Sequence, residues 1–180
     1  MNNQLPYVQQ SLTPGEELIH VGVFHWIYTL QAVLNIFWGV LASILIIAGA
    51  VYFEKNYGGG FASTSTLGHI QELHPGIRLA AFFVLIMGLF GFASRMVIRS
   101  TTEIAITNTR LIYKRGLVAR YVGEMNIDRI EGVNVLQTIW GRMFGYGRIM
   151  VRGMGVGEVI LPPLQDPIAF RRAIEVARTV

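Results

Sequence analysis

Two long apolar runs constrain the fold more than any other feature of this 180-residue chain. The first runs from Ile27 to Phe53 and contains no charged side chain, and the second runs from Leu79 to Ile98. At about 1.5 Å of rise per residue, twenty helical residues cover roughly 30 Å, the thickness of a bilayer's hydrocarbon core. The runs therefore predict a transmembrane hairpin over residues 27–98, with an extracytoplasmic loop at residues 54–76.

The composition agrees with a membrane protein that carries one small polar domain. The mean hydropathy is +0.46 and only 14% of the residues are charged, which is unusually apolar for a soluble domain of this length. The apolar excess lies in the two runs, so residues 99–180 are left for a cytoplasmic domain. The chain has no cysteine, and this excludes disulfides and thiolate metal sites.

Basic residues predict the orientation of the hairpin. The loop side carries Lys55 and Arg78, whereas the other side carries five basic residues close to the second run: Arg95, Arg99, Arg110, Lys114 and Arg115. Because cytoplasmic flanks are enriched in Lys and Arg, we expect a multi-pass membrane protein with both termini in the cytoplasm. No basic segment followed by an apolar stretch precedes the first run, so we expect no cleavable signal peptide.

Residues 1–26 are predicted to form a polar, cytoplasmic amino-terminal segment. Within it, residues 2–10 indicate a frayed terminus, residues 12–17 indicate a turn or a helix start, and residues 18–24 indicate either a strand or an interfacial segment. Aromatic side chains with polar tips settle at the headgroup level, and long arginine side chains can carry their charge there. The predicted membrane-interface residues are His25, Trp26, Tyr28, Arg95 and Arg99.

Small and amide side chains recur on one face of each apolar run. The predicted helix-packing residues are Gln31, Asn35, Gly39 and Ser43 in the first run, with Gly88 and Gly91 in the second. Such residues usually face another helix, because an amide that faces lipid has no hydrogen-bond partner. They could serve the hairpin itself, an oligomer, or both.

From Thr101 onward the apolar pattern changes to a period of two. Short alternating segments separated by turns predict six or seven antiparallel strands between residues 102 and 161. Asp166 and Pro167 then have the residue types of a helix N-cap and first helical position, and an apolar face follows. We therefore predict a mainly-β domain of two antiparallel sheets capped by a C-terminal helix.

Several local motifs strengthen this prediction. They are Pro14-Gly15-Glu16-Glu17, Thr107-Asn108-Thr109-Arg110-Leu111, Ile127-Asp128-Arg129-Ile130-Glu131-Gly132-Val133, Gly141-Arg142, Gly145-Tyr146-Gly147 and Asp166-Pro167. With these motifs the chain resembles the bacterial pleckstrin-homology-like (PH-like) domain family of membrane proteins, the YdbS/YdbT-like group formerly known as a domain of unknown function. The resemblance implies two packed antiparallel sheets closed at one end by a helix, but no particular activity.

Basic residues near two predicted turns are candidates for binding a lipid or phosphate group. Arg142 and Arg148 flank a glycine-rich turn whose backbone N–H groups could cradle a phosphate, and a second cluster comprises Lys114, Arg115 and Arg120. In the structural alternative, Gly145 and Gly147 supply positive φ angles in a tight turn, and Arg142 pairs with Asp128 or Glu131. The second cluster has its own alternative, a solvated hairpin turn.

No motif for catalysis is present, so we expect a protein that is not an enzyme and has no cofactor. His69, Glu72 and His74 in the loop lack the further ligands of a zinc site, and the spacing of His20 and His25 does not favour haem. The sequence favours a self-associating scaffold or assembly protein, with an anionic lipid-headgroup binding module as the alternative. Expected partners are membrane lipids, further copies of the chain and other membrane proteins, with no nucleic acid and no metal.

Overall fold

The computed structural model describes residues 6–116, 121–154 and 157–179. The chain divides into two compact units. Thr29–Met96 form the helical unit, whereas Met1–Tyr28 and Val97–Val180 together form the β unit. The amino-terminal segment, which the sequence analysis set apart from residues 99–180, is thus part of the same compact unit as those residues.

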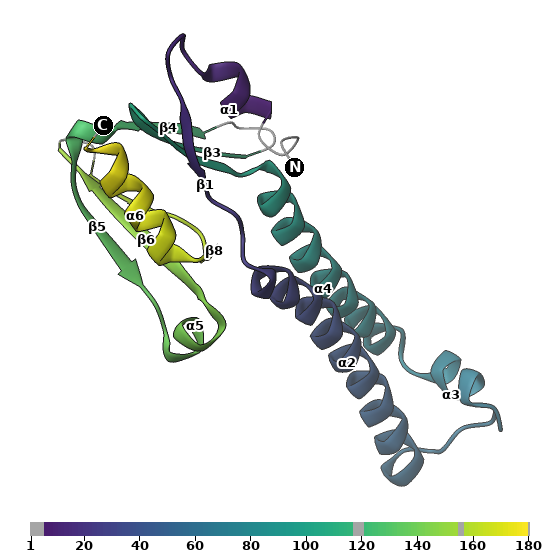
Figure 1. Cartoon of the computed structure of the whole chain (residues 1–180). Helices are drawn as coiled ribbons and strands as arrows, with labels where there is room; N and C mark the ends of the chain where they lie inside the picture. The colour runs from purple at the N-terminus through teal and green to yellow at the C-terminus, as the bar shows by residue number, and fades with distance from the viewer. Residues whose placement is uncertain (1–5, 117–120, 155–156, 180) are drawn as a thin grey trace. The chain divides into compact units, whose positions relative to one another are not determined.

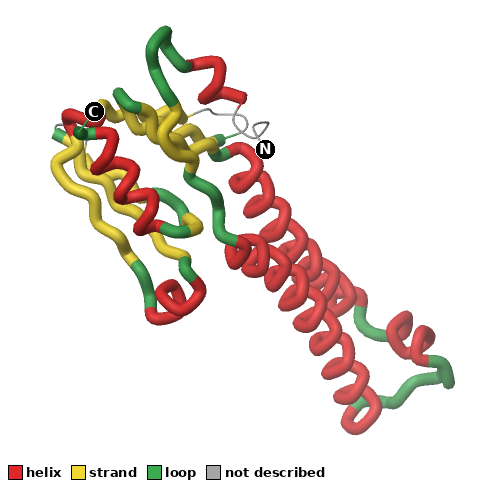
Figure 2. The backbone as a smooth tube through the Cα atoms, viewed as in Figure 1, coloured by secondary structure: helices red, strands yellow, loops and turns green. Residues whose placement is uncertain are grey.

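Two long helices dominate the helical unit (Figure 2). Helix α2 (Trp26–Tyr57) and helix α4 (Pro75–Thr101) are each long and apolar enough to cross a membrane. Both helices extend a few residues beyond the apolar runs and into the polar flanks. The loop between them contains helix α3 (Thr66–Glu72). Ser65 is its N-cap, and the Ser65 hydroxyl accepts the backbone N–H of Gly68.

The β unit contains two antiparallel sheets (Figure 1). The first has the order β1 (Leu18–Val21), β2 (Glu103–Thr107), β3 (Arg110–Arg115) and β4 (Tyr121–Asn126). A short 3-10 helix (Ile127–Arg129) leads to the second, which has the order β5 (Ile130–Leu136), β6 (Tyr146–Gly153) and β7 (Gly157–Ile160), with β8 (Leu164–Gln165) also paired to β6. Residues 18–24, for which a strand or an interfacial segment was expected, thus contribute β1.

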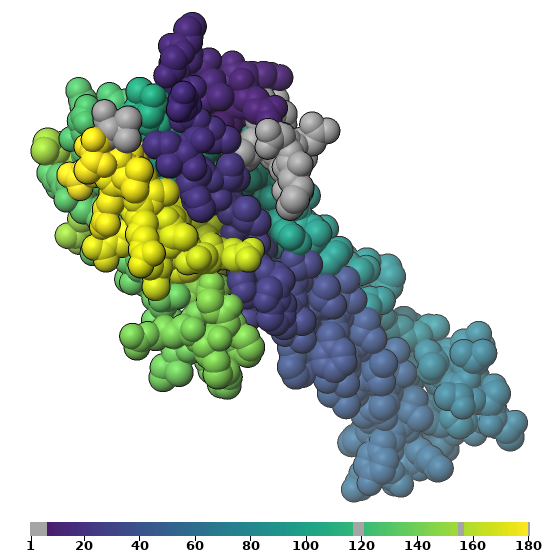
Figure 3. Space-filling view, in the orientation of Figure 1, coloured from purple at the N-terminus to yellow at the C-terminus, as the bar shows by residue number. Residues whose placement is uncertain are grey.

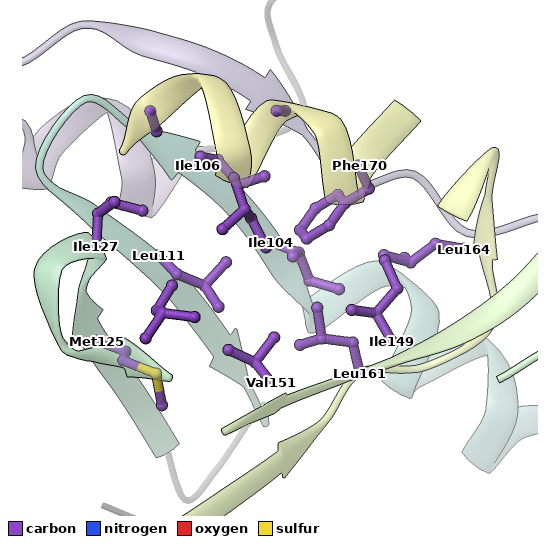
Figure 4. Close-up of a cluster of buried hydrophobic side chains, with 14 residues drawn as sticks. Ile104, Ile106, Leu111, Met125, Ile127, Ile149, Val151, Leu161, Leu164 and Phe170 are labelled. Atoms are coloured by element: carbon purple, nitrogen blue, oxygen red, sulfur yellow. The ribbon is translucent and has the colours of Figure 1, made fainter. Parts of the chain in front are cut away.

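Helix α6 (Pro167–Ala177) closes the β unit and supplies its core (Figure 4). Phe170 and Ile174 are fully buried and pack with side chains from both sheets, among them Ile104 and Ile149. As predicted, Asp166 is the N-cap: its carboxylate accepts the backbone N–H of Ala169, and Pro167 occupies the first turn. The predicted hairpin, two sheets and C-terminal helix are therefore confirmed.

Two short helices differ from the sequence-based expectation. Residues 2–10 were expected to be a frayed terminus, yet Pro6–Ser11 form helix α1, in which Val8 is fully buried against Ala105 and Ile112. The glycine-rich turn after β5 contains helix α5 (Ile139–Phe144). Six residues are too few to show helical periodicity, so tertiary packing and caps decide these segments.

Along the chain, the helical unit lies between two neighbouring strands of the first sheet. Strand β1 precedes α2 and strand β2 follows α4, and the two strands pair with each other in antiparallel register, Val21 opposite Ala105. The connectors are short: residues 22–25 join β1 to α2, and Thr102 alone joins α4 to β2. The β unit is therefore linked to both candidate spans by almost no intervening chain.

Candidate functional site

A buried ion pair fixes the amino-terminal segment to the β2–β3 turn. The side chain of Glu16 is only 1% exposed, and its two carboxylate oxygens accept hydrogen bonds from Nε and Nη2 of Arg110, both at 2.9 Å. Arg110 also donates to the backbone carbonyl of Ser11 and to the carboxylate of Glu124. A bidentate pair of this kind is strong and directional, so it fixes the path of residues 11–17.

The remaining oxygen lone pairs of Glu16 are also satisfied. They accept the backbone N–H and hydroxyl of Thr13 and the hydroxyls of Thr107 and Thr109. Burial by itself raises the pKa of Glu16, but the hydrogen bonds from Arg110, Thr13 and Thr107 outweigh it and lower the pKa to about 2. The same pairing raises the pKa of Arg110, so both groups keep their charge at neutral pH.

A second buried carboxylate uses one of the predicted lipid-binding residues. Glu103 is 3% exposed, accepts the backbone N–H groups of Tyr7 and Val8, and pairs with the ammonium of Lys114. The Lys114 ammonium also lies 5.5 Å from the centre of the Tyr7 ring. Lys114 therefore secures helix α1 to the sheet, and this engagement leaves it poorly placed to bind a phosphate.

A concave feature lies where the α5–β6 turn meets the start of α6. It is a cleft of about 550 Å³, and its lining includes His25, Arg142, Gly145, Asp166 and Ile168. Arg142 is exposed and makes no ion pair within the part of the chain that the structure describes, so the predicted pairing with Asp128 or Glu131 is not observed there. The cleft thus combines one guanidinium with the capping carboxylate of Asp166.

His25, predicted to lie at the membrane interface, is instead 4% exposed within the β unit. Its ring stacks on Tyr146 with the centroids 5.3 Å apart, and its Nδ1 accepts the backbone N–H of Ile27. Burial lowers the pKa of His25, and a hydrogen bond to the backbone of Phe144 opposes this effect. His25 therefore connects the residues that precede α2 to the α5–β6 turn.

The glycines of the Gly-Tyr-Gly motif have different structural roles. Gly145 ends α5 in the left-handed conformation, with φ of 73°. Gly147 does not have a positive φ, contrary to the structural alternative considered above; instead, a Cβ there would lie 2.6 Å from the side chain of Gln137 and 3.0 Å from Pro167. The motif therefore shapes the turn and allows α6 to begin close to β6.

The other predicted basic residues do not converge on one site. Arg148 is an exposed residue of β6, opposite Leu136, and Arg115 lies over the ring of Tyr121 at 5.8 Å. Arg120 falls outside the described residues. The described cations thus lie on three elements: Lys114 and Arg115 on β3, Arg142 on α5 and Arg148 on β6.

The predicted packing residues meet inside the hairpin. A Cβ on Gly39 would lie 2.9 Å from the Cα of Gly88, and a Cβ on Gly91 would lie 3.1 Å from Nδ2 of Asn35. Ser43 is buried on the same helix as Gly39. Near one end of the hairpin, Nη1 of Arg95 donates to Oε1 of Gln31 at 3.3 Å. These side chains therefore serve the contact between α2 and α4.

The remaining predicted interface residues lie at the ends of the long helices. Trp26 is 55% exposed and begins α2, and its ring meets that of Phe144 edge to face, with centroids 6.2 Å apart. Tyr28 packs on Phe24. Arg99 lies in the last turn of α4. Among the described residues, no three His, Asp or Glu side chains gather as a metal site would require.

Comparison with known families agrees with the order of these elements. The family model for the bacterial PH domain matches residues 17–178, which begin one residue before β1 and end one residue after α6. The chain belongs to the bacterial PH domain family. No curated protein and no solved structure gives a significant match.

The motifs that suggested this family now have structural explanations within the PH domain. Glu16 of the first motif binds Arg110 and two threonines of the second, and Asn108 accepts the backbone N–H of Glu17. The contact joins segments more than 90 residues apart, so neither motif by itself could reveal it. The pairing of Glu103 with Lys114 could have been predicted from the sequence, because the predicted Asn108-Thr109 turn places these residues opposite each other.

Proposed function

We propose that this protein is a non-enzymatic membrane scaffold whose spans keep its PH domain at the cytoplasmic surface of a bacterial inner membrane, where the domain pairs with another copy. One observation carries the proposal: the membrane hairpin interrupts the domain between β1 and β2, with connectors of four residues and one residue. A domain tethered twice by such short connectors needs no further affinity for lipid to remain at the membrane. Its exposed surface is then available for protein contacts.

The edge strand β4 is the surface that best fits pairing between copies. β4 ends the order of the first sheet, and among the described residues it pairs only with β3. Its first residues, Tyr121 and Val122, are 54% and 36% exposed. An edge strand with exposed apolar side chains offers backbone groups to another strand, and a two-fold axis is the commonest symmetry of such pairs.

The hairpin is a weaker candidate for self-association. From the sequence, Gly39 and Gly88 could pack within one hairpin or between copies. In the structure they lie against each other within one chain. Once these small residues have packed internally, they are not available for a second hairpin. The proposal therefore places the contact between copies on the PH domain.

A second candidate function is binding of an anionic lipid headgroup. Its support is Arg142, which lines the cleft and has no ion-pair partner among the described residues. Two observations weigh against it: Asp166 places a carboxylate in the same cleft, and Lys114 is engaged by Glu103. If this function holds, Arg142→Ala lowers the amount of anionic lipid that the purified full-length protein retains.

The scaffold proposal can be tested by cross-linking, since the natural chain has no cysteine. Single cysteines are introduced in turn at residues 121–124, and isolated membranes are oxidised. Facing residues of an antiparallel pair have Cα atoms about 4.5–5.5 Å apart, within the range that a disulfide spans. We expect a disulfide-linked dimer for at least one of these positions and none for the matched control Arg172→Cys on the exposed face of α6. Equal cross-linking of all variants, or none at β4, contradicts the proposal.

A further inference from the structure

Helix α5 exposes an apolar surface that no described residue of the β unit covers. Four of its six residues have large apolar side chains, and their exposed fractions are high: Ile139 85%, Trp140 62%, Met143 63% and Phe144 43%. In Figure 3 this segment, coloured green, forms a protrusion at the end of the β5–β6 hairpin. Other exposed apolar side chains of the β unit are spread over several strands and helix α6, whereas these four lie together on one short helix, and such a concentration calls for an external partner.

The helix is held in a defined conformation. The hydroxyl of Thr138 caps its start by accepting the backbone N–H of Gly141 at 3.1 Å, and Gly145 ends it in the left-handed region. Gly141 is buried, and a Cβ there would lie 2.7 Å from the carbonyl oxygen of Tyr146. Because the backbone is fixed from both ends, the apolar side chains are presented as a preformed surface.

The position of Trp26 identifies the partner. Trp26 is the first residue of α2, a candidate membrane span, so it lies where the chain enters the bilayer. Its ring contacts Phe144, and the ring of Phe144 stacks on that of Trp140 with centroids 6.1 Å apart. The exposed surface of α5 is therefore continuous, through these aromatic rings, with the residue that marks the membrane–water boundary.

The charge of the segment fits the same partner. Residues 132–148 contain two arginines, Arg142 and Arg148, and no acidic residue. Arg142 belongs to α5 itself and is exposed. Tryptophan, other apolar side chains and arginine on one short element are typical of segments that lie in the interface of an anionic membrane.

We propose that α5 is an interfacial anchor that inserts the side chains of Ile139, Trp140 and Met143 into the boundary between headgroups and acyl chains, in the membrane that α2 enters. The PH domain is then attached at three places: by α2, by α4 and by this surface. Interfacial helices of this kind bury their apolar face about 5–10 Å below the headgroups. The third attachment would fix which face of the domain points away from the membrane, independently of whether copies associate.

Fluorescence of a single tryptophan tests this inference in the full-length protein. Trp26→Phe and Trp38→Phe leave Trp140 as the only tryptophan, and the protein is reconstituted in vesicles that contain anionic lipid. We expect blue-shifted emission and stronger quenching by nitroxides placed near the headgroups than by nitroxides deep in the acyl chains. A reference variant that keeps only Trp38, within the first span, should show the opposite depth preference.

A tryptophan placed elsewhere on the domain is the matched control. Val176→Trp, in the chain without its natural tryptophans, reports an exposed site on α6 and should show solvent-like emission without lipid quenching. If Trp140 gives the same result as this control, the inference is wrong. Blue-shifted emission of Trp140 without lipid quenching would show that a protein surface covers α5, which also overturns it.

A second probe avoids changing any tryptophan. A spin label attached to Ile139→Cys, the most exposed apolar position of α5, should be relaxed more by oxygen than by a water-soluble nickel complex. A label at Arg172→Cys should show the reverse. Equal preference for the nickel complex at both positions contradicts an interfacial α5, even if the tryptophan variants fold poorly.

Discussion

The carboxylate of Glu16 and the guanidinium of Arg110 form a bidentate pair across 94 residues of sequence, with both oxygen–nitrogen distances at 2.9 Å. Both candidate membrane spans, α2 and α4, lie between these two residues in the sequence. The pair therefore joins the polypeptide that precedes the first span to the strand that follows the second, and it stabilises the PH domain on both sides of the insertion.

Removal of this carboxylate should destabilise the PH domain strongly. Glu16→Ala leaves the partly buried Arg110 without its main partner, and breaking a buried pair in this way costs about 3 kcal/mol. The exposed neighbour Glu17, changed to Ala, is the matched control and should have little effect. Thermal unfolding of the purified protein in detergent measures the difference. Similar unfolding temperatures for the two variants would refute the structural role of Glu16.

The same residue predicts how stability depends on pH. The pKa of Glu16 is about 2 in the folded protein against 4.5 for the ordinary group, so the folded state binds a proton less readily. Its contribution, about 3 kcal/mol, is fully present above pH 4.5 and is lost as the pH falls towards 2. The stability gap between the natural protein and Glu16→Gln should therefore narrow between pH 5 and pH 2. A gap that stays constant over this range would contradict the assignment.

Helix packing in the hairpin should be sensitive at Gly39 and Gly88. An alanine at either position places a Cβ about 2.9 Å from the Cα of the other, so the helices must separate. Gly49→Ala is the control on the same helix, because a Cβ there meets nothing within 4 Å. We expect Gly39→Ala and Gly88→Ala to lower the unfolding temperature, whereas Gly49→Ala leaves it unchanged or raises it. The reverse order would show that α2 and α4 do not pack at these glycines.

Lys114 should act on helix α1 rather than on lipid. Lys114→Met removes the cation that pairs with Glu103, which also holds the backbone of Tyr7 and Val8. We expect faster hydrogen exchange at residues 7 and 8 and no change in retained lipid. Arg115→Met, which alters the adjacent exposed residue, should leave this exchange unchanged. If Lys114→Met loses bound anionic lipid and Arg115→Met does not, Lys114 is a headgroup ligand and this prediction is wrong.

The elements that could be predicted from sequence are those whose signal is local. Asp166 and Pro167 define the start of α6 by capping chemistry, and the apolar runs define α2 and α4 by length. Helix α1 and helix α5 could not be predicted, because six residues are too few to show helical periodicity, and α1 also depends on packing against the distant residues Ala105 and Ile112.

The candidate site also has a part that local motifs indicate and a part that depends on contacts between distant segments. The glycine–arginine motifs pointed to the α5–β6 turn, yet the burial of His25 against Tyr146 depends on the pairing of residues 23–25 with residues 163–165. Lys114 was considered as a lipid ligand, whereas in the structure it forms an ion pair with Glu103. The strand register, which places Glu103 opposite Lys114, was the signal that could have revealed this pair.

The most direct test of the scaffold account is the mass of the full-length complex, measured by native mass spectrometry after release from detergent micelles or lipid nanodiscs. The account predicts an oligomer of defined size that persists across detergents and concentrations, and that dissociates when Val122→Lys places a charge on the edge of β4. A monomer under all conditions would contradict self-association. An oligomer that Val122→Lys leaves intact would contradict its assignment to this edge.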